Sequence, residues 1–397
     1  MKKTMIFAAC AAAVLAAGCA KNEVIQNESP QQAVTFSAYN GRMATKAVSG
    51  TTFGDLNTIS LGDESNAGFG VFAFFSDYSV LGSDFVTSPS NFTPNFMYNQ
   101  NVKGNGDGSD PATAWTYSPL KYWPNEYSTS AALSDQVDKL TFFAYAPYVA
   151  TASVGTEGIT GFSANDATGD PTVSFKVPAA SNQQIDLLWA DQAVSNTQNL
   201  VKQELDGNVH FNFKHALSNL SIYPVAVVDA SSIPNSSGID LDDDAAITVN
   251  SIRISGTFDQ TGTLNLRTGD WTSSPAGSAQ TVTYSPATPL DVTDINDKAE
   301  ADAGNPCAEF MFIPSSNGAK TYTVTIDYDV TYTDSALNGG GLVVKNVIHK
   351  TISLDFEKGK KMKLYIGLGM TSVVFSAEVA DWTPDDPSTI WLPVNTD

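Results

Sequence analysis

The stretch TYTVTIDYDVTY, residues 321–332, most constrains what this chain can fold into. Aromatic and β-branched residues occupy every second position from Tyr322 to Tyr332, with threonine or aspartate between them. Strict alternation of this kind predicts a strand with one buried and one solvated face. We therefore expect an antiparallel sheet that packs one face on a core.

Short apolar runs separated by Gly, Ser, Thr, Asn and Asp recur along the chain, without a long amphipathic helix among them. The run FGVFAFF, residues 69–75, is typical of a strand buried on both faces. In ITVNSIRISGTF the apolar parity changes between Val249 and Ile252, which predicts a β-bulge. The expected fold class is all-β.

The length of the chain and the order of these runs predict two domains. Five or six expected strands precede residue 200, and the alternation then restarts at Val209, Phe211 and Phe213. A mature chain of 379 residues (397 minus 18) is too long for one β-sandwich. The expected parts are an N-terminal β-sandwich over residues 47–204, a C-terminal β-sandwich over residues 205–381 and a tail over residues 382–397.

Residues 1–18 are typical of an export signal. A short apolar core follows two lysines, and Ala17-Gly18 directly precedes Cys19, as in bacterial lipoprotein signals in which the thiol is lipidated. The alternative is ordinary signal cleavage near Ala17, which leaves Cys19 as a free thiol. Cys10 leaves with the signal and Cys19 takes the lipid, so only Cys307 remains and no intramolecular disulfide is expected.

The charge balance limits the partners. The net charge is −21, and loss of the two signal lysines makes it −23. Nucleic acid and anionic membrane surfaces are therefore unfavourable partners. With 42% hydrophobic and only 16% charged residues, the chain can bury a core, which suits a folded extracellular protein.

A strand comes first after the tether that follows the signal. In the stretch AVTFSAYNGRMATK, Val34, Phe36 and Ala38 fall on one face, and Asn40-Gly41 marks a turn.

Arg42 and Lys46 follow that turn beside small residues, as in a loop open to a protease. We therefore assign residues 19–46 to a tether and a removable first strand, with cleavage after Arg42 or Lys46. The alternative is that both are ordinary surface residues of an uncut loop.

The sequence contains no recognisable catalytic or metal-binding constellation. HExxH and GxSxG do not occur, and His210 and His215 are an odd number of residues apart, so they face opposite sides of a strand. The acidic stretches at residues 105–110 and 241–244 are either calcium-binding or solvated loops. We expect neither a cofactor nor a metal site, and not an enzyme.

Motifs that carry a family resemblance follow one another along nearly the whole chain. They are KNEV after Cys19, TKA at 45–47, KYWPNE at 121–126, LTFFAYAP at 140–147, DLLWA at 186–190, FKHALSNL at 213–220, GTFDQTGTLNL at 256–266 and the final stretch KGKKMKLYIGLGMTSVVFSAEVADW. On these residues the chain resembles the fimbrillin family of Bacteroidetes.

The resemblance implies two tandem transthyretin-like antiparallel β-sandwich domains. It also implies export as a lipoprotein anchored in the cell outer membrane through Cys19, surface display, and assembly into type V pili that contribute to adhesion. The implied partners are other pilin subunits, a trypsin-like protease that removes the N-terminal strand, and a host or bacterial surface ligand. A donor strand from another subunit then fills the groove, and a stalk or a tip position is equally compatible with the resemblance.

The tail STIWLPVNTD offers a donor strand. Ile390, Leu392 and Val394 alternate with bulkier or polar residues, which is the chemistry of strand addition. Pro393 removes one backbone donor, which an edge strand tolerates. The alternatives are a disordered tail and a last strand folded on its own domain. For the whole protein, the alternative function is a monomeric surface lipoprotein that binds a glycan or a host protein through its loops.

Overall fold

The fold was analysed in a computed structural model. It describes residues 32–39, 68–77, 82–104, 115–124, 138–201, 208–228, 232–241, 243–274, 279–304, 306–315, 318–334, 341–370, 373–381 and 390–391.

One sheet gathers strands from the N-terminal half of the chain. Its strands, in order across the sheet, are β1 (Thr35–Tyr39), β9 (Asn208–His215), β8 (Leu188–Ala190), β5 (Lys139–Ala146), β2 (Phe69–Ser76), β3 (Met97–Gly104) and β4 (Trp115–Thr116). Strand β2 is the run FGVFAFF, and nearly all of its side chains are buried. Phe69, Val71 and Ala73 belong to one core, and Phe72 and Phe74 belong to another, which confirms the prediction of a strand buried on both faces.

The two faces of this sheet define two cores. The first core holds the apolar side chains of one face, among them Val34, Phe36, Phe69, Phe142 and Phe211. The second core lies between the other face and a four-stranded sheet, in the order β13 (Trp271–Ser274), β12 (Thr261–Asn265), β7 (Thr172–Lys176) and β6 (Gly158–Phe162).

The strand pairing crosses the boundary predicted at residues 204/205. Strand β9 pairs with β8, and the hairpin β12–β13 pairs with β7 through β12. Leu264 and Leu266 are fully buried in the second core, beside Phe175. The alternation of this hairpin requires a core for its apolar face but does not say which sheet supplies it. The division into two domains stays a prediction.

Two further sheets form the C-terminal half and enclose a third core. One has the order β16 (Ala308–Phe312), β10 (Ser218–Ala226), β19 (Lys360–Leu368), β20 (Val373–Asp381) and β21 (Ile390–Trp391). The other has the order β14 (Gln280–Tyr284), β11 (Ala245–Gly256), β17 (Lys320–Tyr332) and β18 (Leu342–Leu354), and β15 (Leu290–Asp291) also pairs with β11. Strand β17 runs antiparallel to both neighbours and buries Tyr322, Val324, Ile326, Tyr328 and Val330, as the alternation predicts.

Of two predictions about strand pairing, one is confirmed and one is wrong. The register of β11 against β17 shifts between Val249 and Ser251, which confirms the predicted bulge. The expectation of antiparallel sheets throughout is wrong for two pairs, because β1 lies parallel to β9 and β10 lies parallel to β19. Both pairs join segments far apart in sequence, where the connection is long enough to permit a parallel arrangement.

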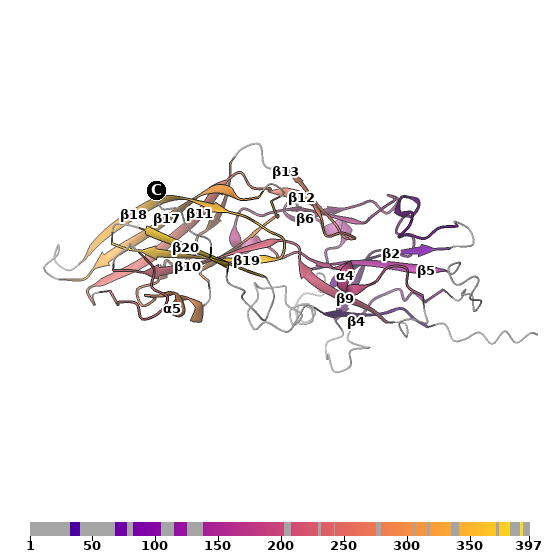
Figure 1. The fold of residues 1–397 in the computed structure, drawn as a ribbon, viewed down its shortest axis with the longest axis horizontal. Helices are drawn as coiled ribbons and strands as arrows, with labels where there is room; N and C mark the ends of the chain where they lie inside the picture. The colour runs from indigo at the N-terminus through magenta and orange to yellow at the C-terminus, as the bar shows by residue number, and fades with distance from the viewer. Residues whose placement is uncertain are drawn as a thin grey trace, which may run out of the picture.

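The molecule is elongated, with β2 and β5 near one end and β17, β18 and β20 near the other (Figure 1). Strands β6, β12 and β13 lie between them. The α-helices of the described residues are short: α4 (Gln192–Ser195) and α5 (Lys298–Ala303). In the described ranges, no helix has the length and apolar character needed to cross a membrane.

The placement of β12 can be tested with two neighbouring residues that face opposite sides. Leu264→Ala should lower the free energy of unfolding by about 2–5 kcal/mol, because it removes buried carbon atoms from the second core. Thr263→Ala, on the outer face, should change it by no more than about 0.5 kcal/mol. Urea denaturation followed by tryptophan fluorescence measures both variants, and equal effects would contradict this placement.

Candidate functional site: the first strand and its groove

Strand β1 lies at the edge of the seven-stranded sheet. It pairs in parallel with β9, and Phe36 lies opposite Val209 while Ala38 lies opposite Phe211. Parallel pairing requires a partner that is remote in the chain, and β9 follows β1 by more than 160 residues. The first strand is therefore held by a segment from the middle of the protein.

The start of β1 is also bonded on its other side. The backbone N–H of Val34 donates to the carbonyl of Lys121 (2.9 Å), and the N–H of Trp123 donates to the carbonyl of Gln32 (3.0 Å). The segment that holds these partners follows β4, which is the opposite edge of the sheet. The first strand, one edge of the seven-stranded sheet, is thus bonded to the segment that follows the opposite edge strand, and it closes the first core.

The inward face of β1 is buried in that core. Val34 is 0% exposed, Phe36 1% and Ala38 8%, which confirms that the three residues share one face. Within the described parts of the chain, four other aromatic rings surround the Phe36 ring. The distances between ring centroids are 5.3 Å to Tyr117, 5.7 Å to Phe211, 5.8 Å to Phe142 and 6.4 Å to Phe69.

Tyr117 adds a polar contact to this apolar enclosure. Its hydroxyl group donates to the carbonyl of Val34 over 2.8 Å in a buried position. Burial raises the pKa of the Tyr117 phenol, although the backbone N–H of Lys121, which donates to the phenol oxygen, acts in the opposite direction. The phenol therefore stays protonated, and remains a donor to the first strand, through the neutral pH range.

The outward face of β1 is polar. The Ser37 hydroxyl is hydrogen-bonded to Nδ1 of His210, which lies opposite it on β9. This contact is exposed, so it adds little to the free energy that holds the strand. The apolar face carries most of the attachment.

Several residues that the sequence singles out lie outside the described residues. They are Cys19, Arg42, Lys46, Leu392 and Val394, together with the acidic stretch at residues 105–110 and Asp242 of the second acidic stretch. In the described parts of the chain, no three His, Cys, Asp or Glu side chains gather closely enough to hold a metal ion.

The backbone of the proposed donor segment is described at two residues only. Ile390 and Trp391 form β21, which pairs antiparallel with β20: Ile390 lies opposite Val379, and Trp391 lies opposite Glu378. This is the position expected if the tail folds on its own domain, one of the three alternatives that the sequence leaves open.

Sequence patterns alone did not find the residues that hold β1 from the side of β4. Tyr117, Lys121 and Trp123 lie in an aromatic-rich stretch, WTYSPLKYWP, of which only the part from Lys121 onward belongs to a motif of the family resemblance. The concentration of aromatic residues in a segment with little strand character was the available signal. It indicates a buried connection, but not what that connection contacts.

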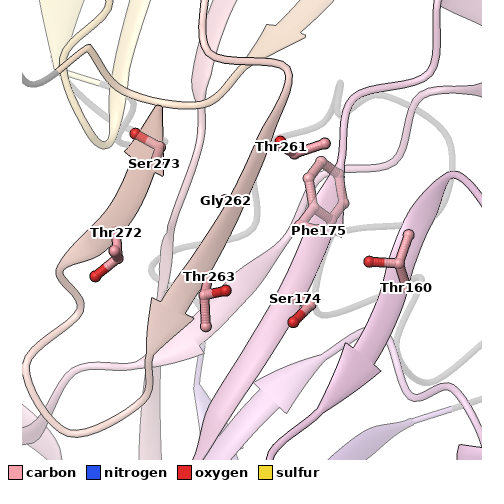
Figure 2. A pocket seen from close by; sticks show the side chains of 8 residues that line it. All are labelled: Thr160, Ser174, Phe175, Thr261, Gly262, Thr263, Thr272 and Ser273. Atoms are coloured by element: carbon pink, nitrogen blue, oxygen red, sulfur yellow. The ribbon is translucent and has the colours of Figure 1, made fainter. Parts of the chain in front are cut away.

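A second candidate site is a shallow depression of about 330 Å³ on the outer face of the four-stranded sheet. Figure 2 shows that hydroxyl side chains from all four strands surround it, among them Thr160, Ser174, Thr263 and Thr272. It has no charged residue in its lining. Such a surface offers several hydroxyl groups for hydrogen bonding.

The contribution of the Phe36 ring contacts to the free energy of unfolding can be measured directly. Phe36→Ala should lower the free energy of unfolding by about 3–5 kcal/mol, because the ring fills space between four others. Ser37→Ala on the same strand serves as the control and should cost less than about 1 kcal/mol. Urea denaturation followed by circular dichroism gives both values. A loss for Phe36→Ala no larger than that of the control would contradict the described burial.

Comparison with known proteins gives consistent results. Residues 62–382 match the family described as Fimbrillin-like. The fimbrium subunit Fim1C of Phocaeicola vulgatus is 30% identical over 206 residues, which is 52% of this chain and 47% of that protein. The matched part therefore spans about half the length of this relative.

Solved structures are similar to the chain over most of its length. A fimbrial protein from Bacteroides vulgatus has a TM-score of 0.61 and 22% identity, and the match covers 89% of this chain and all of that one. A putative cell adhesion protein from Bacteroides uniformis has a TM-score of 0.45 and 18% identity, with 88% of this chain and 99% of that one covered. The first of these supports the fold. Because the family profile covers most of the chain, the protein belongs to the fimbrillin-like family of structural, non-enzymatic proteins.

Proposed function

We propose that the protein is a structural subunit of a cell-surface pilus that assembles by strand exchange after a protease removes its first strand. One observation carries the proposal: β1 closes the first core from the edge of a sheet, and Phe36 anchors it there. The relative in Phocaeicola vulgatus, named as a fimbrium subunit, supports the same role.

The position of β1 suits removal. As a terminal strand of its sheet, it can leave without separating any other pair of strands. Its departure exposes Phe69, Phe142 and Phe211 in the first core. Exposure of such apolar surface is unfavourable in water, so the open groove is expected to accept another apolar strand.

The covalent link between β1 and the rest of the chain runs through residues 40–46, with Arg42 and Lys46. Cleavage after either residue by a trypsin-like protease leaves β1 held by non-covalent contacts alone. Cleavage also favours exchange, because the released strand is no longer covalently tied to the groove that it leaves.

The proposal also covers the anchoring of the precursor, its fold, its partners and its donor strand. Lipidation at Cys19 anchors the precursor in the outer membrane, and processing then releases it into a fimbrium at the cell surface. The fold corresponds to two tandem transthyretin-like β-sandwich domains, and the partners are other pilin subunits and an adhesion ligand. The donor is the tail, with Ile390, Leu392 and Val394 facing the groove.

A second candidate function is a monomeric surface lipoprotein that binds a glycan or a host protein. The pairing of β21 with β20 favours it, because a tail that remains on its own sheet donates nothing to a neighbour. Polymerisation after cleavage separates the two functions.

Limited trypsin treatment of the unlipidated precursor should produce a ladder of oligomers on a gel run without boiling. N-terminal sequencing should give a new end at Met43 or Ala47. The double variant Arg42→Ala and Lys46→Ala should remain monomeric under the same treatment. A trimmed protein that stays monomeric, or the absence of a cut in this loop, would refute the pilus proposal.

Deletion of residues 388–397 should abolish the ladder while the precursor remains folded, because the tail supplies the donor strand. Circular dichroism before protease treatment checks the fold. Polymers formed by the deletion variant would place the donor elsewhere in the chain.

A further inference from the structure

We propose that the space occupied by Phe36 is the subsite of the groove that selects the incoming strand and sets its register. The inference rests on the proposed function. We call this space the Phe36 socket and define it by the rings of Phe69, Tyr117, Phe142 and Phe211. It accepts one large apolar side chain.

The socket is built from four separate parts of the fold. Phe69 lies on β2, Phe142 on β5 and Phe211 on β9, while Tyr117 follows β4. The Phe211 ring is stacked on Phe36 at an interplanar angle of 17°, whereas the Phe142 ring meets it at 79° and the Phe69 ring at 88°. Rings of different orientation on different strands enclose a side chain from several directions.

The walls of the socket are supported independently of Phe36. The Phe69 ring also contacts Trp115, Phe211 and Phe213, with centroid distances of 4.9, 5.7 and 5.4 Å. Trp123 and Phe96 contact the Phe142 ring. A cavity with walls held in this way closes only partly when its occupant becomes smaller, so a small side chain leaves unfilled space there.

This geometry allows the Phe36 socket to fix the register of an incoming strand. The side chains of a strand alternate, so a shift of one residue would turn the polar face of an incoming strand into the first core. A shift of two residues would place a different inward side chain in the socket. The positions of Val34 and Ala38 hold smaller side chains, so the required pattern is one large apolar residue with smaller apolar residues two positions before and after it.

The occupant that we infer is the tail of a second copy of this chain. Ile390, Leu392 and Val394 have the same spacing as Val34, Phe36 and Ala38, which places Leu392 in the socket. Leucine lacks the aromatic ring that the four walls surround. The tail therefore fills the socket less well than Phe36 does, and Leu392→Phe should bind more tightly than the natural tail.

The test uses three variants of the full-length precursor after the same trypsin treatment: Leu392→Phe, Leu392→Ala and, as a control on the opposite face, Asn395→Ala. The ladder of Leu392→Phe should resist higher temperatures in detergent than the natural ladder, and that of Leu392→Ala should dissociate at lower temperatures. Asn395→Ala should behave like the natural chain. Equal resistance of all four proteins would overturn the inference while leaving strand exchange intact.

A peptide of residues 33–39 examines the groove without the tail. Added in excess during cleavage, it should occupy the groove and block the ladder. The peptide with Phe36→Ala should require about a hundredfold higher concentration, whereas the peptide with Ser37→Ala should act like the natural one. Equal potency of all three peptides would overturn the inference that the Phe36 socket selects the incoming strand. A natural chain that forms no ladder after cleavage and takes up no peptide would instead refute the proposed function.

Discussion

The burial of Phe36 among the rings of β2, β5, β9 and the segment after β4 is the contact on which the N-terminal half depends. Those elements are far apart in the chain, and β1 pairs with β9 on one side and bonds to the segment after β4 on the other. A short edge strand would ordinarily contribute little to stability. Here one aromatic side chain contacts the neighbouring strand, the centre of the sheet and the segment after the opposite edge strand, so this short strand closes a large core.

The central strands of the sheet connect the first core, which contains Phe36, to the second core. Strands β2, β5 and β8 send side chains into the first core from one face and into the second core from the other. The second core also contains Leu264 from the hairpin β12–β13 and Met311 from β16. The N–H of Met311 donates to Oε1 of Gln184 in a buried hydrogen bond, which ties the C-terminal sheets to the N-terminal ones. The groove is therefore attached to a framework that continues into both halves of the molecule.

The same arrangement explains how a strand can be both buried and replaceable. An interior strand of the sheet is hydrogen-bonded to a neighbour on each side, so its removal would break both ladders. Strand β1 instead has one ladder, with β9, and a few bonds at its start. Its attachment comes mainly from side chains that enter the core at every second position. Another strand with the same alternation can reproduce these contacts, because backbone pairing does not depend on sequence.

Local sequence patterns determined the fold class, the faces of most strands, the bulge near Val249 and the inward face of β1. These features follow from the two-residue period of a strand, which is legible in a short stretch of sequence. Three features were decided only by the tertiary structure: the parallel pairing of β1 with β9, the use of the hairpin β12–β13 in the second core, and the enclosure of Phe36 by four rings. Alternation shows that a residue needs a core, but the choice of core depends on contacts between segments that are far apart in the chain, and no local pattern records them.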